Sequence, residues 1–341
     1  MYQLVSPTPQ NLQLTDTAQS LPSRTRRRAL IFLALVATVV YVGAAVVTDA
    51  SKTRGALVQL GWVGCLSVLA LSALNYLLRF YRWQNYLARL GRVLPTSLHL
   101  LYYLSGFAFT VSPAKAGEAF RSVHLREHGV TYSESIAALF AERLLDLTAM
   151  CLLASFIAFD HEAFRPLIAG VLVAACALLA AARHGFLPHQ LQSFSAASKH
   201  RRVAIALATL ANLLRASHRL LQPRPLALGL SIGLVSWGAE GVGFYLICQG
   251  LQLNVATSTA IGIYAIASLA GSAAFFLPAG IGGMEIVMTS LLIAQNASLQ
   301  TALIATLLCR IATLWFAVLL GIATSAIIEF TSAPRPIRSA S

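Results

Sequence analysis

Five charged residues lie inside apolar runs of the chain and are the first candidates for chemistry: Glu142, Arg143, Asp146, Glu240 and Arg310. A charge at the centre of a membrane helix costs roughly 2.5 to 3.5 kcal/mol on insertion scales, so each side chain needs a partner or water. Glu142 and Asp146 are four residues apart and share one helix face. Because a guanidinium binds phosphate oxygens through paired hydrogen bonds, the arginines predict recognition of a phosphate-bearing head group, with the carboxylates orienting them. The alternative is a buried ion-pair network that locks two halves of the fold together.

The charges belong to a pattern that occurs twice. Glu118 and Glu285 are 167 positions apart, and so are Arg143 and Arg310. Each copy begins with a Pro-Ala break and continues into an apolar run, so the sequence predicts a duplicated unit of break, glutamate and membrane helix with arginine. Glycine permits the positive φ that a sharp break requires. The predicted turn residues of the two breaks are Pro113, Gly117, Pro278, Gly280, Gly282 and Gly283.

Polar residues beside the breaks complete the predicted substrate-binding set. Lys115, Glu118 and Glu285 join the five charges above. Each glutamate could take a proton or a head-group amine, or else cap a half-helix by accepting backbone N–H groups. Backbone N–H groups near Gly117 and Gly282 could add the positive end of a helix dipole.

The composition fixes the class of protein. Apolar residues make up 57% of the 341 residues, charged residues 11%, and the mean hydropathy is +0.71. A soluble domain carries roughly 25% charged residues, so the chain is predicted to be a polytopic membrane protein. The net charge of +13 comes from basic residues clustered between apolar runs. There they set topology and meet anionic lipid, and nucleic acid is not an expected partner.

Metal and redox chemistry are not expected. The five cysteines fall within apolar runs without the spacing of metal ligands, which is typical of small core residues. His124, Glu127 and His128 spell H-x-x-E-H, the pattern of one zinc-protease class. No third ligand follows them, so zinc catalysis is disfavoured.

The apolar runs predict about six membrane helices in an all-α fold. A run of about 20 apolar residues crosses a hydrocarbon core of roughly 30 Å. The predicted spans are residues 29–48, 56–78, 135–159, 166–182, 225–248 and 299–328. They form a single transmembrane domain over residues 29–330. A disordered basic cytoplasmic tail is predicted for residues 1–28 and a second cytoplasmic tail for residues 331–341.

Two basic segments are predicted to face the cytoplasm. Arg79 and Arg82 follow the second span among aromatic residues, which predicts a basic aromatic belt at the membrane surface. Residues 183–224 are also basic, and their apolar piece, residues 203–214, is too short to cross. This segment is interpreted as an amphipathic helix on the cytoplasmic leaflet.

Two further apolar stretches are interpreted as re-entrant hairpins. If residues 97–111 crossed the membrane fully, the basic residues after them would lie outside, against the positive-inside rule. Irregular backbone at membrane depth is allowed where protein buries it or it lines a wet cavity. The second hairpin joins residues 259–277 to 284–294 and enters from the other side. Repeat 1 (about 56–182) and repeat 2 (about 225–330) then form an inverted-topology repeat, as in secondary transporters.

Several pieces of the chain together resemble one known family. RFYRWQNYL, SPAKAGEAFRSVHL, the AERLLD run, LPAGIGGMEIVM and LLCRIATLWFAVLLG resemble the transmembrane region of lysylphosphatidylglycerol synthases, a flippase-like family of integral membrane proteins. The resemblance implies a lipid translocator. Bifunctional relatives add a cytosolic aminoacyl-transferase domain, which is not expected for this protein. Pro-Ala-Lys115-Ala-Gly stands where many relatives carry Pro-Gly-Arg-x-Gly.

The predicted function is movement of a phospholipid or other phosphate-bearing amphipathic lipid between the leaflets of a bacterial inner membrane, with both termini cytoplasmic. No cofactor is expected, and G-x-x-x-x-G-K-[ST], the ATP-binding motif, is absent. A second hypothesis is a non-catalytic scaffold for a lipid- or glycan-modifying enzyme. A membrane transferase is disfavoured because no nucleophile and base stand out. Translocation predicts that Arg143 and Arg310 line one polar cavity with an acid in reach.

Overall fold

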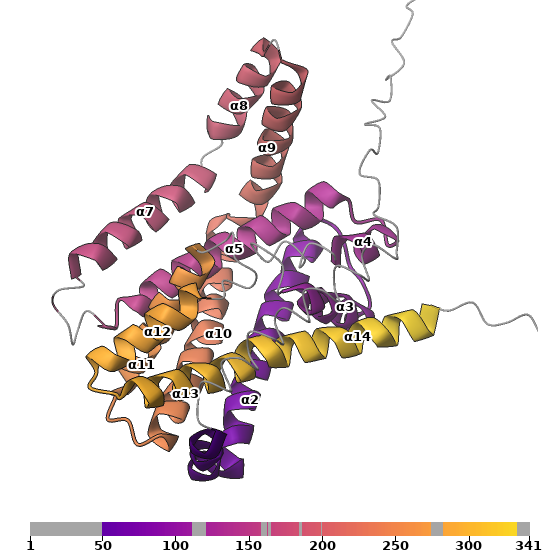
Figure 1. Cartoon of the computed structure of the whole chain (residues 1–341). Helices are drawn as coiled ribbons and strands as arrows, with labels where there is room; N and C mark the ends of the chain where they lie inside the picture. Colours follow the sequence, from indigo (N-terminus) through magenta and orange to yellow (C-terminus); the bar gives the residue numbers. More distant parts are fainter. Residues whose placement is uncertain are drawn as a thin grey trace, which may run out of the picture.

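The computed structural model describes residues 50–110, 121–157, 162, 165–183, 186–198, 200–273 and 282–332. This part of the chain is helical and contains no strand, which confirms the all-α class (Figure 1). Its helices are α2 (Ala50–Arg89), α3 (Thr96–Ser105), η1 (Gly106–Phe109), α4 (Arg121–Arg126), α5 (Tyr132–Ala154), α7 (Arg165–Arg183), α8 (Phe186–Ala197), α9 (Arg201–Leu220), α10 (Pro223–Gly250), α11 (Thr257–Ala273), α12 (Gly283–Ala294), α13 (Leu299–Arg310), η4 (Ile311–Trp315) and α14 (Phe316–Ser332).

Three helical segments within this part are long and apolar enough to cross a membrane: Thr53–Arg89, Pro223–Gly250 and Leu299–Thr331. They coincide with the predicted spans at residues 56–78, 225–248 and 299–328, so a helical multi-pass membrane protein is confirmed. The predicted first span and the predicted N-terminal tail lie outside the described residues, as does the predicted C-terminal tail beyond Ser332. The count of six spans and the inverted repeat stay predictions.

Both predicted breaks are flanked by short helices. η1 ends at Phe109 and α4 starts at Arg121 on either side of the first break, and α11 and α12 flank the second. The break residues 111–120 and 274–281 lie outside the described residues. Helices α11 and α12 pack against each other, and α3 packs against α4, as the two arms of each predicted hairpin should.

The basic segment after α7 forms a helical hairpin rather than one short helix. Helix α9 runs over 20 residues, longer than the apolar piece that the sequence suggested. It packs against α8 and against α5. The α8–α9 hairpin projects from the rest of the bundle in Figure 1.

The described hydrophobic side chains form two cores. One, the α10–α13 core, gathers residues of α10, α11, α12 and α13, and the other, the α2–α3 core, gathers residues of α2, α3 and α14. Helices α2 and α5 pass from one core to the other. So does the segment Leu299–Thr331, which we call the C-terminal span. The changeover falls between Val68 and Tyr76, between Leu145 and Ala149, and between Ala312 and Ala317. We call this boundary the seam.

Glycines let helices within each core approach closely. A Cβ at Gly241 of α10, next to Glu240, would lie 3.0 Å from the Ile261 Cα of α11. A Cβ at Gly321 of α14 would lie 2.0 Å from the Ala108 nitrogen of η1. Small residues at helix interfaces allow such packing in membrane proteins.

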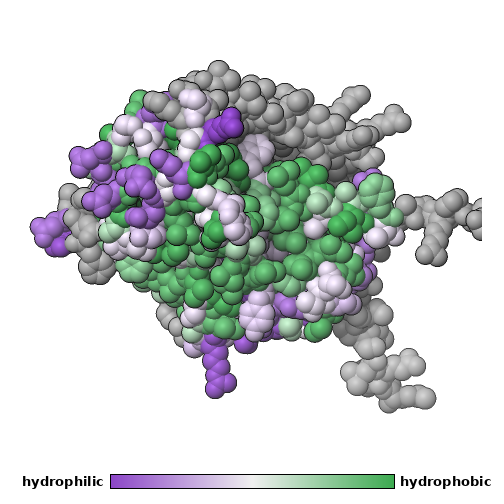
Figure 2. All heavy atoms as spheres, turned by 90° about the horizontal axis from the view of Figure 1, so that it is seen from below, coloured by the Kyte–Doolittle hydropathy of each residue, from purple (hydrophilic) through white to green (hydrophobic). Residues whose placement is uncertain are grey.

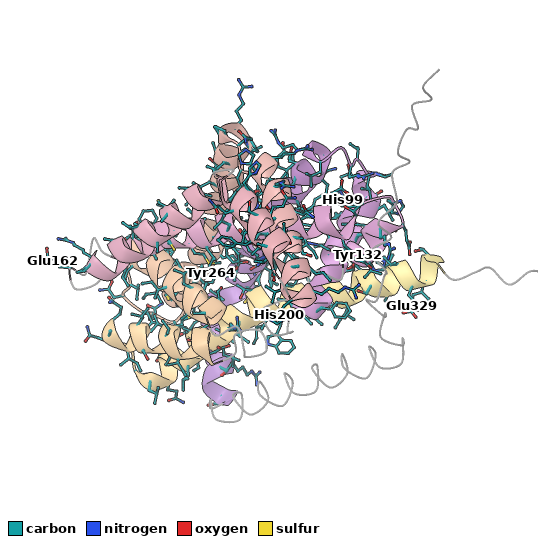
Figure 3. The ribbon with its side chains drawn as sticks, turned by 90° about the horizontal axis from the view of Figure 1, so that it is seen from above. His99, Tyr132, Glu162, His200, Tyr264 and Glu329 are labelled. Atoms are coloured by element: carbon teal, nitrogen blue, oxygen red, sulfur yellow. The ribbon has the colours of Figure 1, made fainter. Side chains whose placement is uncertain are left out.

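The outer surface is largely apolar. Figure 2 shows an extended hydrophobic face, and large apolar side chains of α2 and α14 such as Trp62, Leu319 and Phe330 are exposed. A surface of this kind suits contact with lipid chains. Charged Glu162 and Glu329 instead lie at opposite edges of the molecule (Figure 3).

Candidate functional site: a buried ion-pair network beside a polar cavity

The charges of α5 form a buried network with arginines of two other helices. Glu142 accepts from Arg79 of α2 at 3.1 Å and from Arg121 of α4 at 2.7 Å. Asp146, one turn further, accepts from Arg82 of α2 at 2.5 Å. All five side chains are at least nine-tenths buried. Because they come from three helices, the ion pairs join α2, α4 and α5.

Aromatic and backbone groups complete the network. The Tyr103 hydroxyl donates to Glu142 at 3.2 Å, and Arg82 also donates to the Gly229 carbonyl of α10. The Arg121 guanidinium carbon lies 3.6 Å from the centre of the Trp83 ring, a cation–π contact. Buried arginines need such partners because an unpaired buried charge is strongly destabilising.

Arg79 and Arg82 are therefore not part of a surface belt, and that prediction is wrong for these two residues. They lie three positions apart, so they share the α2 face that meets α5. Glu142 and Asp146 are four positions apart on another helix, which is nearly the same spacing. This match was the signal in the sequence that could have paired the two arginines with the two acids. Arg89, about two turns beyond Arg82, is exposed, as a belt residue would be.

Arg143 lies at the edge of this network. Its guanidinium nitrogens are 3.8 Å from Glu142 and 3.9 Å from Asp146, and its side chain is 30% exposed. The sequence predicted that Arg143 is a central ligand-binding group. The structure instead assigns the short contacts with both acids to arginines of α2 and α4.

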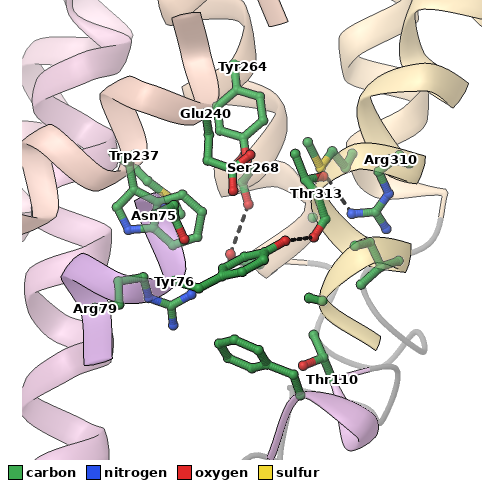
Figure 4. A pocket seen from close by; sticks show the side chains of 17 residues that line it. Asn75, Tyr76, Arg79, Thr110, Trp237, Glu240, Tyr264, Ser268, Arg310 and Thr313 are labelled. Atoms are coloured by element: carbon green, nitrogen blue, oxygen red, sulfur yellow. Dashed lines mark hydrogen bonds between the residues drawn. The ribbon is translucent and has the colours of Figure 1, made fainter. Parts of the chain in front are cut away.

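A polar cavity opens at the seam next to the network (Figure 4). It offers about 70 Å³ to the centres of water molecules, several times the roughly 10 to 15 Å³ that one water needs. Its walls come from α2, η1, α5, α10, α11, α12 and the C-terminal span. The lining residues are Asn75, Tyr76, Arg79, Phe107, Thr110, Met150, Trp237, Glu240, Tyr264, Ser268, Gly271, Ser272, Met284, Arg310, Thr313, Leu314 and Ala317.

Polar groups of several helices face this cavity. The Ser72 hydroxyl donates to Glu240 Oε2 at 3.2 Å. The Asn75 side-chain oxygen and the Thr110 hydroxyl are buried and have no hydrogen-bond partner among the described residues. Buried polar atoms normally have partners, so these two favour a cavity that holds water or a polar ligand.

Of the two predicted arginines, Arg310 lines the cavity and Arg143 does not. The expectation that both line one cavity is wrong for this cavity. Its second arginine is Arg79, whose guanidinium lies over the Trp237 ring at 5.1 Å and also reaches Glu142. Arg79 thereby connects the network to the cavity.

Glu285 performs the capping role that was one of its two predicted roles. The Gly282 N–H donates to Glu285 Oε2 at 2.8 Å at the start of α12. The other oxygen of Glu285 accepts from Arg310 Nε at 2.8 Å. Gly282 has a φ of 94°, a positive value that suits glycine in a turn, and Gly283 begins α12. Glu285 thus holds Arg310 in place and is not itself part of the cavity lining.

The span that carries Arg310 changes its helical form at the cavity. Residues Ile311–Trp315 form a π-helix, in which Phe316 N–H donates to the Ile311 carbonyl five residues earlier. Such turns are rare and occur frequently at functional sites. The Tyr76 hydroxyl donates to the Thr313 carbonyl at 2.5 Å. Nothing in the sequence indicated this turn, because its apolar pattern continues unbroken.

The remaining predicted residues are placed as follows. Pro113, Lys115, Gly117, Glu118, Pro278 and Gly280 lie outside the described residues. The His124 ring stacks on Tyr102 with centroids 5.0 Å apart, and His128 Nε2 lies 3.2 Å from the Tyr102 hydroxyl. In the part of the chain that the structure describes, no group of His, Cys, Asp and Glu has the geometry of a metal site.

One family model matches most of the chain. It is described as the lysylphosphatidylglycerol synthase TM region, and it matches residues 30–321. This stretch includes the network, the cavity and both breaks. No protein of curated function matches the chain significantly in sequence.

Proposed function

Since the chain belongs to the family of the lysylphosphatidylglycerol synthase TM region, we propose that it translocates a phospholipid or other phosphate-bearing lipid between membrane leaflets. The observation that carries the proposal is the polar cavity, which brings Arg79 and Arg310 together inside an otherwise apolar helix bundle. Two guanidinium groups on different helices suit a phosphate, because each can donate two hydrogen bonds in one plane. Acyl chains would stay in the surrounding lipid.

The neighbours of the two arginines keep them charged and oriented without filling the cavity. Arg310 is bonded to Glu285 through Nε, and Arg79 is bonded to Glu142 through one Nη atom. Both acids lie outside the cavity lining. A phosphate that enters would therefore meet guanidinium groups already held in position, which lowers the entropy cost of binding it.

The seam supplies a route for movement. The cavity lies between the α10–α13 core and the α2–α3 core, so a shift of one core against the other would change which side of the cavity is open. Rocking of one half against the other around a central site is how many secondary transporters give alternating access. We place the protein in a bacterial inner membrane with both termini cytoplasmic, and we propose membrane lipid as its direct partner.

A scaffold for a lipid-modifying enzyme is the second candidate, and the ion-pair network favours it. Five buried charged side chains that join three helices would suit a rigid support. A rigid support needs no water-sized cavity beside the network, however, so translocation explains more of the observed features.

A leaflet-resolved assay tests the proposal. The full chain is reconstituted in vesicles that contain fluorescently labelled phosphatidylglycerol. A reductant that cannot cross the membrane quenches the label in the outer leaflet only. The wild type is expected to expose inner-leaflet lipid faster than protein-free vesicles do. Arg310→Ala removes one phosphate ligand and is expected to slow this at least about tenfold, since a charge-assisted hydrogen bond contributes about 1.5 to 3 kcal/mol.

The matched control is Arg165→Ala. Arg165 is also an arginine with a glutamate partner, but it and Glu162 are exposed at the edge of the molecule. Its variant should move lipid at the wild-type rate. If the wild type moves no phosphate-bearing lipid faster than empty vesicles, translocation is refuted and the scaffold reading takes its place.

A further inference from the structure

The π-helix, residues Ile311–Trp315, lies where the C-terminal span passes from one core to the other, and we call it the joint. Before it, α13 packs against α12 and α10; after it, α14 packs against α3 and η1. Ala312 belongs to the α10–α13 core and Ala317 to the α2–α3 core. A change in the turn between them would therefore change how one core is oriented on the other.

Tyr76 of α2 contacts this joint through the hydrogen bond of its hydroxyl group. Its ring packs against Phe107 of η1 and Phe316 of α14, with centroids 5.2 and 5.9 Å away. These contacts fix the ring to the α2–α3 core. Its hydroxyl donates to the Thr313 carbonyl inside the π-helix. Figure 4 shows this hydroxyl directed at Thr313 from across the cavity.

The same hydroxyl faces the space where a phosphate would bind. Tyr76, Arg79 and Arg310 all line the cavity. A phenol has one proton to donate. It therefore cannot donate a full hydrogen bond to the Thr313 carbonyl and to a phosphate oxygen at the same time. An anionic oxygen is the stronger acceptor of the two.

From this competition we propose that Tyr76 is a head-group ligand that also controls the joint. In the empty cavity its hydroxyl donates to Thr313 and stabilises the π-helix. When a phosphate group binds, the hydroxyl donates to a phosphate oxygen and the Thr313 carbonyl loses its donor. The turn is then less protected, and the two cores are free to shift. The inference rests on the proposed function and adds to it the group that links binding to movement.

Hydrogen exchange of the full-length protein in lipid nanodiscs tests the link, read on peptides covering residues 311–318. The probes are short-chain phosphatidylglycerol, diacylglycerol with the same chains, and inorganic phosphate. Deuterium uptake in the wild type should rise with phosphatidylglycerol and stay unchanged with diacylglycerol. Tyr76→Phe should show the raised uptake without lipid and no further rise. Its affinity for phosphatidylglycerol should fall about fivefold, because binding in the wild type exchanges a hydrogen bond to the neutral Thr313 carbonyl for a stronger one to a charged oxygen.

Tyr81→Phe is the matched control, because Tyr81 is an exposed tyrosine of the same helix. It should behave as the wild type in both measurements. The proposal is overturned if phosphatidylglycerol binds the wild type without raising uptake over residues 311–318, or if Tyr76→Phe binds it as tightly as the wild type. A rise with inorganic phosphate alone would overturn the lipid head group as the ligand.

The vesicle assay separates this proposal from the proposed function. Wild-type protein that moves lipid while its π-helix shows no change on binding would overturn the role of Tyr76 and leave translocation standing. Wild-type protein that neither binds nor moves phosphatidylglycerol would overturn both.

Discussion

The ion-pair network and the cavity contain the same residue types and use them differently. In the network, Glu142 and Asp146 accept at 2.5 to 3.1 Å from three arginines, with ring faces and a backbone carbonyl around them. In the cavity, Arg310 is bonded to Glu285, while a space large enough for water lies on its other side. Residue type alone therefore does not decide whether a buried charged side chain is structural or can bind a ligand. The difference is whether a cavity lies beside it.

The largest expected effect is in the network. Glu142→Ala would leave Arg79 and Arg121 without their shared carboxylate inside the protein, and breaking a buried ion pair from one side costs about 3 to 5 kcal/mol. Thermal unfolding in detergent should show a large drop in stability. Glu162→Ala, at an exposed pair, is the control and should change little. Unfolding of the Glu142 variant near the wild-type temperature would contradict the structural role of the network.

Arg143→Ala tests whether Arg143 belongs functionally to the ion-pair network or to the cavity. The long contacts and partial exposure of Arg143 predict a loss of about 1 kcal/mol or less, as for a surface pair. Lipid movement should persist, because this side chain does not line the cavity. Loss of transport with unchanged melting would show that Arg143 contacts the lipid after all and would extend the binding region beyond the cavity.

The smallest effect is expected at an ion pair outside both regions. Partial burial raises the pKa of Glu134, but hydrogen bonds from the Thr131 N–H and hydroxyl and from Arg92 outweigh it, so the pKa lies below its ordinary value of 4.5. A lowered carboxyl pKa stabilises the fold above pH 4.5, and this contribution is lost as the pH falls through the lowered pKa. Glu134→Gln should therefore destabilise by about 0.2 to 1 kcal/mol at pH 7.

Melting curves between pH 3 and 7 check this expectation. The difference between the wild type and Glu134→Gln should shrink toward the acidic end. A difference that grows on acidification would contradict the lowered pKa. The result also measures what a partly buried pair contributes, for comparison with the fully buried network.

Local sequence rules predicted the parts of the site that depend on neighbours along the chain. Gly282 and Glu285 are three residues apart, so a turn with positive φ and a carboxylate cap could be inferred from their types. The pairing of Glu142 with Asp146 on one face followed from helical spacing. Arg79 and Arg82 were assigned to the surface, because an arginine next to aromatic residues at a span's end has the same local pattern whether it is buried or exposed.

The sequence by itself determined the helical membrane class, the family, three of the spans and the residues that must find partners, because apolar length and buried charge are properties of a local segment. Tertiary structure alone decided which arginine meets which acid, where the cavity lies and where the helix widens. Arg79 and Glu142 are 63 positions apart, and Tyr76 and Thr313 are 237 apart. Contacts over such sequence separations depend on how the helices pack. Helical periodicity carries no information about which other helix supplies the partner.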